Sequence, residues 1–500
     1  MGDGGASAAP EHYPIISACK RFILKGDGYM RLMKYTLDDF SRGFRADKVS
    51  DTMESGATPE AYNFSMLNGT LKTMRGYSVY SPNNIVYNGQ TYRIMLPMVY
   101  YSAKSTVSSN KDVLMVVGST GSIRCIFVYE NGRWVKEDGN MSEADMGYVN
   151  YYFNSANYLL VTNELDGMLK YDRMGKLEFF EDTPLLSSMT VHHDRVWGIG
   201  YDSMPNTVMY SAVGDPALWE ENGQLSISTY DGDRFIYIDS VFDDIVLYRN
   251  KSLFRIVGTD PDNYRLQQIP AATGACGKLA VANDGKRSFY VGDDGIYEFD
   301  GIRADMLEND GLRLFFEEKV NKDRLQWACA CIFGGKLYVS LPIEGAMFNN
   351  AVIEYDLASK SFAIRRGINA ACLFIFADKL MFSDDEGYLY TLDDGTTLGG
   401  EIIRAHYATP HTDLGAKNKV KTLDSIYIVA RGTGKLQITA ETENDVSVKM
   451  VEMRSSTDLD VYKVEMYAMG RRFRFAFDNV DGSVVEIVRP EFYFEVDEED

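Results

Sequence analysis

The chain has 500 residues, of which 45% are hydrophobic and 25% are charged, and its formal net charge is −21. This composition is typical of a folded globular protein and excludes a disordered chain. No apolar run reaches the roughly 18 residues that span a bilayer. The acidic excess disfavours a surface that grips nucleic acid, because phosphates need Lys and Arg partners. It serves either solubility or a surface past which DNA must slide without sticking.

The N-terminal part, residues 1–77, is expected to be an arm with lead-in strands. Residues 1–16 resemble a flexible lead. The first ten residues contain neither the basic segment nor the apolar segment of a signal peptide, so we expect synthesis in a cytoplasm. Asn68-Gly69 lies between two alternating segments within residues 61–77, which is typical of a two-residue hairpin turn.

Residues 78–395 repeat one pattern seven times: a short apolar strand, a turn rich in Gly and Asp, and a second strand rich in aromatics. Successive repeats begin 38 to 49 residues apart, and a four-stranded propeller blade takes roughly 40–50 residues. The pattern predicts an all-β fold with a β-propeller of about seven blades. The predicted strand pairs are Val113–Val117 with Ile123–Tyr129, Tyr158–Val161 with Met168–Tyr171, Val196–Ile199 with Val208–Tyr210, Ile245–Tyr248 with Leu253–Val257, Phe289–Val291 with Ile296–Phe299, Leu337–Ser340 with Val352–Tyr355, and Leu380–Phe382 with Tyr388–Leu392.

A different pattern occupies residues 396–500, where apolar and polar residues alternate almost strictly. Such alternation gives each strand one buried face, and we expect a compact C-terminal β-sandwich. The six expected strands are Leu423–Ala430, Leu436–Glu441, Val461–Met466, Arg472–Phe477, Val484–Val488 and Phe492–Val496. The best helical candidate in the whole chain is Asp310–Lys322, which could cross between two blades.

His192-His193-Asp194 is the most conspicuous group among only five histidines. Neighbouring residues of a strand point to opposite faces, so we do not expect both histidines to bind one metal. A turn with a solvated histidine is the favoured interpretation.

Two acidic turns, Val291–Tyr297 and Ser383–Tyr388, faintly resemble the Asp-box turns of sialidases but lack their regular Ser-x-Asp-x-Gly-x-Thr-Trp pattern. Hydrogen bonding within the turn is the favoured role, with calcium binding left open. The six cysteines are expected to be buried and free: Cys19, Cys125, Cys276, Cys329, Cys331 and Cys372. We predict no catalytic, cofactor-binding or metal-binding residues and no cofactor.

One passage is more specific than these groups. In it, Asp215-Pro216 is expected to fix a turn, Trp219 to fill the space between two blades, and Asp231-Gly-Asp to lead into the next inner strand. The passage resembles virion β-propeller proteins of tailed bacteriophages, including the nozzle-type tail proteins of short-tailed phages. The residues that carry the resemblance are Gly214-Asp-Pro-Ala-Leu-Trp219, Gly223-Gln-Leu-Ser-Ile-Ser, Asp231-Gly-Asp-Arg-Phe235 and Ile245–Gly258, with Asp51–Asn63, Asn68–Gly76, Gly470-Arg-Arg-Phe-Arg-Phe and Asn479–Gly482 near the two ends.

The resemblance implies a non-enzymatic structural protein of the tail nozzle or head-to-tail region, located in the virion and assembled in the bacterial host cytoplasm. It implies a homo-oligomeric ring, by analogy of six copies, that forms part of the DNA conduit and contacts other tail, portal or fibre proteins. DNA would pass without sequence-specific binding, and no membrane span is expected.

Two alternatives from other classes stay open at this point. The first is a carbohydrate-binding or carbohydrate-active propeller, that is, a host-surface adhesin or a glycosidase; a cluster of acidic and aromatic residues at one propeller mouth would favour it. The second is a soluble cellular propeller that serves as a platform for protein interactions.

Overall fold

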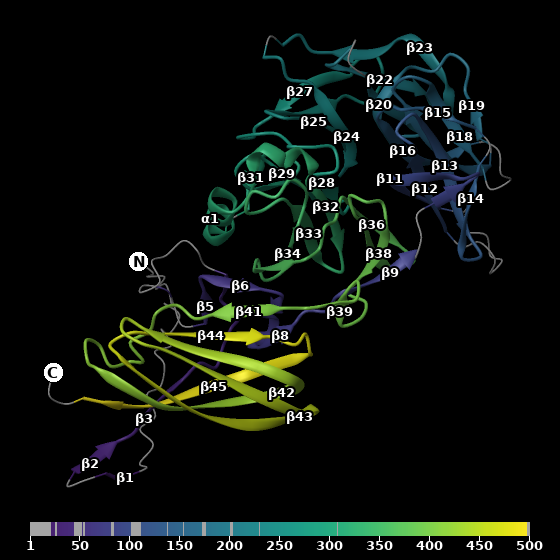
Figure 1. Cartoon of the computed structure of the whole chain (residues 1–500). Helices are drawn as coiled ribbons and strands as arrows, with labels where there is room; N and C mark the ends of the chain where they lie inside the picture. Colours follow the sequence, from purple (N-terminus) through teal and green to yellow (C-terminus); the bar gives the residue numbers. More distant parts are fainter. Residues whose placement is uncertain are drawn as a thin grey trace, which may run out of the picture. The chain divides into compact units, whose positions relative to one another are not determined.

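The computed structural model describes residues 22–497, except residues 26–27, 45–52, 54–55, 82–84, 102–111, 138, 154, 173–176, 201–203, 230 and 308. The chain divides into two compact units, one of residues 75–401 and one of residues 1–74 together with 402–500 (Figure 1). The predicted division had three parts, with boundaries after residues 77 and 395. The predicted flexible lead (residues 1–16) and Cys19 lie outside the described residues.

The unit of residues 75–401 is a seven-bladed β-propeller, as predicted. Figure 1 shows the blades in chain order from dark blue to green. The first three blades contain β10 (Ile85–Tyr87), β11 (Gln90–Tyr100), β12 (Val113–Ser119), β13 (Ile123–Glu130), β14 (Arg133–Lys136) and β15 (Met141–Ser142); β16 (Met146–Phe153), β17 (Ala156–Asn163), β18 (Gly167–Tyr171) and β19 (Leu177–Phe179); and β20 (Leu186–His192), β21 (Arg195–Gly200), β22 (Thr207–Ala212) and β23 (Asp215–Ser226).

Blades 4 to 6 follow the same antiparallel order, and blade 7 also contains one parallel pair of strands. They contain β24 (Phe235–Val241), β25 (Asp244–Arg249), β26 (Leu253–Val257) and β27 (Arg265–Ile269); β28 (Val281–Asn283), β29 (Ser288–Val291), β30 (Ile296–Phe299) and β31 (Ala304–Met306); β32 (Cys329–Phe333), β33 (Lys336–Leu341), β34 (Ala351–Asp356) and β35 (Phe362–Arg366); and β36 (Cys372–Phe376), β37 (Lys379–Ser383), β38 (Leu389–Leu392), β9 (Tyr77–Ser81), β39 (Thr397–Leu398) and β40 (Glu401–Ile402).

All seven strand pairs predicted from the sequence are confirmed as the second and third long strands of a blade. Each pair is antiparallel, as in Val246↔Arg255 and Val339↔Ile353. The pattern was visible because these strands are buried on both faces and follow each other directly in the chain. The last blade is the exception to this local order, since its strand β38 pairs with β9 from the beginning of the unit. This pairing closes the ring of blades.

Apolar and aromatic side chains fill the spaces between neighbouring blades. One cluster joins blades 3 and 4 through Trp197, Tyr210 and Phe254, and another joins blades 4 and 5 through Tyr248 and Tyr290. Aromatic rings suit this position because they bury a large apolar area and pack edge-to-face. The ring centroids of Trp197 and Tyr264, for example, lie 5.1 Å apart, and the angle between the two ring planes is 70°.

The predicted helix is confirmed as α1 (Asp310–Glu318), in the connection between blades 5 and 6. The Asn309 side chain caps it by accepting a hydrogen bond from the Leu312 amide at 3.1 Å. In the part of the chain that the structure describes, no helix is both long enough and apolar enough to span a membrane.

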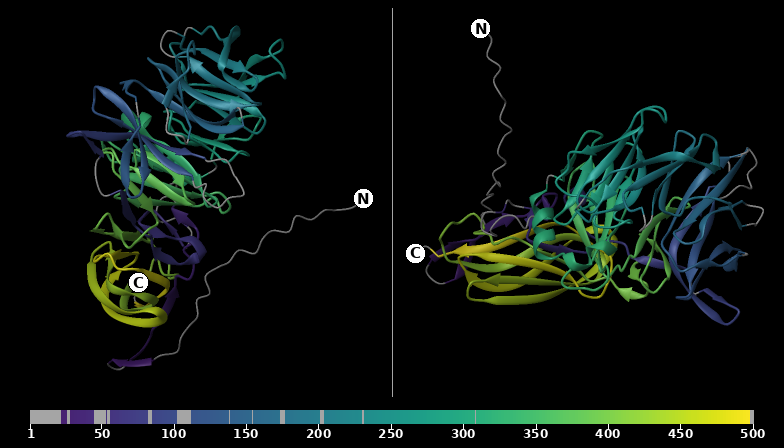
Figure 2. Two further views of the ribbon diagram at one scale, coloured as in Figure 1. Left: turned by 90° about the vertical axis from the view of Figure 1, so that its right-hand side faces the viewer. Right: turned by 90° about the horizontal axis from the view of Figure 1, so that it is seen from above.

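The second unit is built around one sheet of nine strands. Its long strands are β42 (Lys421–Thr442), β43 (Val446–Gly470), β44 (Phe473–Asn479) and β45 (Val485–Val496), with β41 (Ala405–Ala408) beside β44. The alternation predicted one buried face per strand, and β44 alternates in this way over its whole length. The sheet curves around a core that includes Phe475, Phe477 and Phe492 (Figure 2).

Two predicted strand boundaries in this unit were wrong. One strand was predicted to end at Ala430 and the next to begin at Leu436, but the chain continues through residues 431–435 as β42, with a register shift between Ala430 and Gly432. Gly432 has a φ of 144°, and a Cβ there would lie 2.5 Å from the Val484 carbonyl oxygen. Gly432 therefore occupies a position where a residue without a side chain is required. The extra residues at the register shift lie on β43, between Ser455 and Asp460, which pair with Gly432 and Ala430. Likewise, the last two predicted strands are one strand, β45.

The segment predicted to be an N-terminal arm contributes strands to this sheet. β3 (Met33–Thr36) pairs with β45, β6 (Glu60–Tyr62) pairs with β41, and β7 (Phe64–Ser65) and β8 (Leu71–Thr73) form a hairpin beside β45. The predicted hairpin is thereby confirmed, although its loop of residues 66–70 is longer than two residues. The remaining short strands are β1 (Phe22–Lys25) with β2 (Gly28–Arg31), and β4 (Gly43–Phe44) with β5 (Ala57–Thr58).

Candidate functional site

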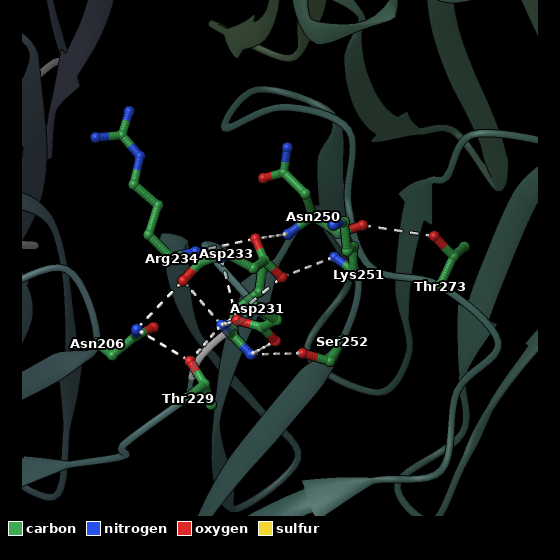
Figure 3. Close-up of polar contacts among 10 residues, drawn as sticks. Asn206, Thr229, Asp231, Asp233, Arg234, Asn250, Lys251, Ser252 and Thr273 are labelled. Carbon is green, nitrogen blue, oxygen red and sulfur yellow. Dashed lines mark hydrogen bonds and ion pairs between the residues drawn. The ribbon is translucent and has the colours of Figure 1, made fainter.

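The passage that carries the phage resemblance folds into a hydrogen-bond network around the buried Arg249. Figure 3 labels residues of this network, among them Asp231, Asp233 and Ser252. Asp231 and Asp233 lie in the connection from β23 to β24, which leads from blade 3 to blade 4. Arg249 is the last residue of β25, at the turn to β26. The network thus joins a connection between blades to a turn within the next blade.

The Arg249 guanidinium is surrounded by acceptors, and the residue is only 1% exposed. Its Nη2 donates to Asp231 Oδ1 at 2.8 Å, to the Asp233 carbonyl oxygen at 2.8 Å and to Thr229 Oγ1 at 3.0 Å. Its Nη1 donates to Asp231 Oδ2 and to Ser252 Oγ, each at 3.2 Å. The pairing with Asp231 uses both carboxylate oxygens, the geometry for which a guanidinium is suited.

Asp233 fixes the turn from the other side. Its carboxylate accepts hydrogen bonds from the amides of Asn250 at 3.1 Å and Lys251 at 3.0 Å, and it lies 3.6 Å from Arg249 Nε. The hydrogen bonds from Arg249 lower the pKa of Asp231 to about 2, so that carboxylate is ionised at neutral pH. Both acids therefore compensate the buried charge of Arg249.

The next connection, from blade 4 to blade 5, packs onto the same turn. Gly274 and Ala275 donate backbone hydrogen bonds to the carbonyl oxygens of Asn250 at 3.2 Å and Arg249 at 2.9 Å. A Cβ at Gly274 would lie 1.9 Å from the Arg249 carbonyl oxygen, so no larger residue fits without displacing the backbone. Two successive blade connections are held by one arginine-centred turn.

The roles predicted for the beginning of the passage are confirmed in two cases. Trp219 packs against the apolar cluster between blades 2 and 3, which includes Tyr151 and Val196. Its Nε1 donates to the Pro216 carbonyl oxygen at 2.9 Å. Asp231-Gly-Asp precedes β24, whose residues line the centre of the propeller. The turn itself lies one step earlier than predicted, at Val213-Gly214, and Asp215 begins β23.

The centre of the propeller contains a cavity of about 360 Å³ lined by the first long strands of the blades. Asp239 is the one carboxylate among the described residues that line it. It accepts hydrogen bonds from the Asn283 side chain and from the Ser240 amide, and its burial raises its pKa to about 6. Glycosidases use two carboxylates around the scissile bond, so this cavity lacks the pair.

Lys278 lines both this cavity and a second one of about 400 Å³. It lies just before blade 5, and its Nζ donates to Asp145 Oδ2 at 3.2 Å and to the carbonyl oxygens of Met146 and Ser187, each at 2.6 Å. An ammonium group has three donors, and here all three have acceptors in blades 2 and 3. Lys278 therefore links the segment before blade 5 to blades 2 and 3 by hydrogen bonds. Neither Lys278 nor Asp239 belongs to a motif, which is why sequence analysis did not find them.

The two acidic turns use their carboxylates for hydrogen bonds within the turn, as expected. Asp384 accepts from the amides of Glu386 and Tyr388 and from the Tyr390 hydroxyl at 2.8 Å. Asp294 accepts from the Tyr297 hydroxyl at 2.7 Å. Turn chemistry accounts for these residues.

The predicted turn with a solvated histidine is present: His193 and Asp194 connect β20 to β21, and the His193 side chain is 62% exposed. The expectation that the two histidines point to opposite faces was wrong. Their ring centroids lie 3.9 Å apart, because His193 has left the strand and has a left-handed backbone with a φ of 47°. Burial and the neighbouring His193 lower the pKa of His192.

The cysteines within the described residues are free, as predicted: Cys125, Cys276, Cys329 and Cys372 are buried, and Cys331 is half-buried. Burial raises the pKa of the Cys331 thiol to about 12. A thiol with such a pKa is protonated at neutral pH and is a poor nucleophile.

Comparisons with known proteins give no family for this chain, since no family model and no curated protein matches it. Among solved structures, a chain in the crystal structure of BBS1N in complex with ARL6DN is 10% identical over 60% of this chain and 96% of that chain, with a TM-score of 0.37. XC5397 from Xanthomonas campestris, a gluconolactonase, is also 10% identical, over 65% of this chain and 99% of that one, with a TM-score of 0.31.

Proposed function

We propose that this protein is a non-enzymatic structural component of a tailed-phage virion, in the tail nozzle or head-to-tail region. Copies of the chain would form a ring, with six favoured by analogy, that encloses part of the DNA conduit and contacts neighbouring tail, portal or fibre proteins. The observation that carries the proposal is the passage Gly214–Gly258. Its resemblance to phage propeller proteins lies in residues that together form the blade junction around Arg249.

The role of those residues favours a scaffold. Asp231 and Asp233 of the passage are engaged with Arg249 and with backbone amides, which makes them structural residues that fix the order of the blades. A ring in a virion must keep its shape while DNA moves through it, and a polar network that makes several hydrogen bonds to one buried side chain favours one rigid arrangement. The carbohydrate alternative has less support, because the central cavity offers a single carboxylate among the described lining residues.

The second unit offers a surface for contacts between copies. Among the described strands, β43 pairs only with β42, so one long edge of it has no strand beside it. Its exposed apolar side chains are Val446, Val448, Met450, Leu459, Val461, Tyr467 and Met469. A long apolar edge strand promotes association with another chain. We take a second copy of this protein as the partner.

The acidic charge of the chain fits a conduit. A net charge of −21 repels phosphates on average, so DNA would slide past the copies without a strong attraction. The conduit would be enclosed by the copies together, since the propeller's own cavity of about 360 Å³ is far too small for a duplex.

Native mass spectrometry of the full chain, followed by negative-stain imaging, tests the proposal. We expect a ring with a central hole, or a monomer that forms rings when phage neck or tail proteins are added. Val461→Asp with Tyr467→Asp should abolish ring formation, whereas the control Ile302→Asp, at a propeller residue 73% exposed, should not. A chain that stays monomeric when these partners are added, and that binds or cleaves a glycan, would overturn the proposal.

A further inference from the structure

Two turns of neighbouring blades bring three metal-binding side chains together. His192 and His193 lie at the turn from β20 to β21 in blade 3, and Asp243 lies at the turn from β24 to β25 in blade 4. Within the described part of the chain, these are the one group of three His, Cys, Asp or Glu residues whose possible ligand atoms all lie within 4.8 Å of one another.

The hydrogen bonds of the group prepare it for a cation. His193 Nε2 lies 2.9 Å from Asp243 Oδ1, and His192 Nδ1 lies 2.9 Å from Ser240 Oγ. When Nδ1–H of His192 donates to the serine hydroxyl, its Nε2 keeps the lone pair that a metal binds. A hydrogen bond from the second ring nitrogen is the usual way in which proteins orient a metal-binding histidine.

The backbone of the histidine turn is held in place from three directions. The His192 carbonyl oxygen accepts from Trp197 Nε1 at 3.3 Å. The Asp194 carbonyl oxygen accepts from the Gly214 amide at 2.7 Å and from the Tyr151 hydroxyl of blade 2 at 2.8 Å. The turn is therefore positioned by blade 2 and by the rest of blade 3 before any ligand arrives, which lowers the entropic cost of binding.

The turns also place residues in conformations that usually favour glycine. His193, Asp194 and Phe242 have φ values of 47°, 55° and 58°. Asn-Gly would fit a two-residue hairpin turn at less cost. A left-handed bulky residue such as Phe242 is uncommon, and strained backbone of this kind gathers at functional sites.

We propose that His192, His193 and Asp243 bind one divalent transition-metal ion of the zinc class, which links blade 3 to blade 4. Two imidazoles and a carboxylate suit Zn²⁺, whereas Ca²⁺ and Mg²⁺ prefer sites made of oxygen atoms. Ligand atoms around a tetrahedral Zn²⁺, with bonds of about 2.0–2.1 Å, lie about 3.3 Å apart. The three ligand atoms lie within 4.8 Å of one another, so small side-chain rotations would be needed to reach that spacing, and solvent would supply the remaining ligand.

Isothermal titration of the tag-free full chain with ZnCl₂ at pH 7.5 tests this site. We expect one Zn²⁺ per chain, and at least tenfold weaker binding in His193→Asn and in Asp243→Asn. Asparagine tolerates the left-handed backbone at position 193, so that turn should keep its shape. Asp194→Asn is the matched control: it changes a charge in the same turn outside the ligand group and should keep the wild-type affinity.

A second readout separates binding at this site from binding elsewhere. Zn²⁺ should raise the unfolding temperature of the wild type and of Asp194→Asn but leave that of His193→Asn and Asp243→Asn unchanged. Co²⁺ should give the strong visible absorption of a four-coordinate ion in the wild type and in Asp194→Asn, but not in His193→Asn or Asp243→Asn. No zinc binding by the wild type, or equal binding by all four proteins, would overturn the proposal.

Discussion

The two units of this protein differ in how their strands are distributed along the sequence. Six of the seven blades are continuous segments in which each long strand pairs with the next one along the sequence. The second unit is assembled from both ends of the chain, so that Leu71 in β8 faces Ile487 in β45. Both units are almost entirely β, yet only one of them repeats. A blade is a local unit and leaves a period in the sequence, whereas a sheet made of distant segments leaves only alternation.

The largest expected effect comes from separating the two ends. A chain of residues 75–401 should fold as a propeller, whereas residues 402–500 alone should stay unfolded. The missing segment supplies the buried side chains of Leu37, Phe40, Phe64 and Leu71 to the core of the second unit. Burying each contributes about 1.5–3 kcal/mol, and their sum matches the whole stability of a typical domain, about 5–15 kcal/mol.

Circular dichroism and urea unfolding of the two fragments measure this difference. Adding residues 1–74 in trans to residues 402–500 should restore β structure, and a scrambled peptide of the same composition is the control. If residues 402–500 fold alone with a cooperative transition, the second unit does not depend on both ends of the chain.

The contrast also explains what could be predicted from the sequence. Pairs such as Val246 with Arg255 follow from short apolar strands and one turn, so the propeller was predictable. The continuation of β42 through Gly432 was not, because a glycine-rich segment looks like a turn until the partner strand is known. The contribution of β3, β6, β7 and β8 to the second unit was also hidden. These strands are two to four residues long, too short for a reliable pattern.

The polar sites were less predictable than the strands. Asp231 and Asp233 were predicted as turn residues, but nothing in their spacing showed that Arg249 would be their partner. His192 and His193 were wrongly assigned to opposite faces of a strand. Side chains alternate between faces only inside a strand, and here the turn begins between the two histidines. Such contacts depend on where a strand ends, and sequence patterns place strand ends with an error of a few residues.

Arg249→Met should have the next largest effect, and it tests whether a propeller of local blades still depends on its junctions. The substitution leaves Asp231 and Asp233 without their cation, and breaking a buried ion pair costs about 3–5 kcal/mol. Urea unfolding of the full chain should show the loss in the propeller transition. Arg303→Met is the control, because its pair with Asp305 is exposed and contributes at most about 1 kcal/mol. Equal effects of both substitutions would show that the network does not stabilise the junction.

Gly274→Ala should destabilise the same junction by a smaller amount. The new Cβ would lie 1.9 Å from the Arg249 carbonyl oxygen, so the connection between blades 4 and 5 must shift. Steric overpacking of this kind costs about 1–3 kcal/mol. Thr273→Ala, one residue earlier, should change the free energy of unfolding by less than about 1 kcal/mol, because its weak hydrogen bond to the Asn250 carbonyl oxygen is 3.5 Å long. If the two variants are equally stable, the close approach at Gly274 is not required.

The last effect concerns Asp239 in the central cavity and appears only as a change with pH. Its folded-state pKa of about 6 lies above the ordinary value of about 3.9, so between these pH values the folded protein binds more protons than the unfolded chain. Stability should therefore fall as pH rises from about 4 to about 6, by up to about 2–3 kcal/mol from this residue. Asp239→Asn removes the charge and should flatten the dependence of the free energy of unfolding on pH in this range. Compared with the wild type, the variant should therefore gain stability at pH 7 relative to pH 4. Asp305→Asn, at an exposed carboxylate, is the control and should keep the wild-type slope. Because the cavity is shared by all seven blades, an unchanged slope in Asp239→Asn would mean that solvent in the cavity keeps this carboxylate hydrated, and that the propeller centre is wetter than its lining suggests.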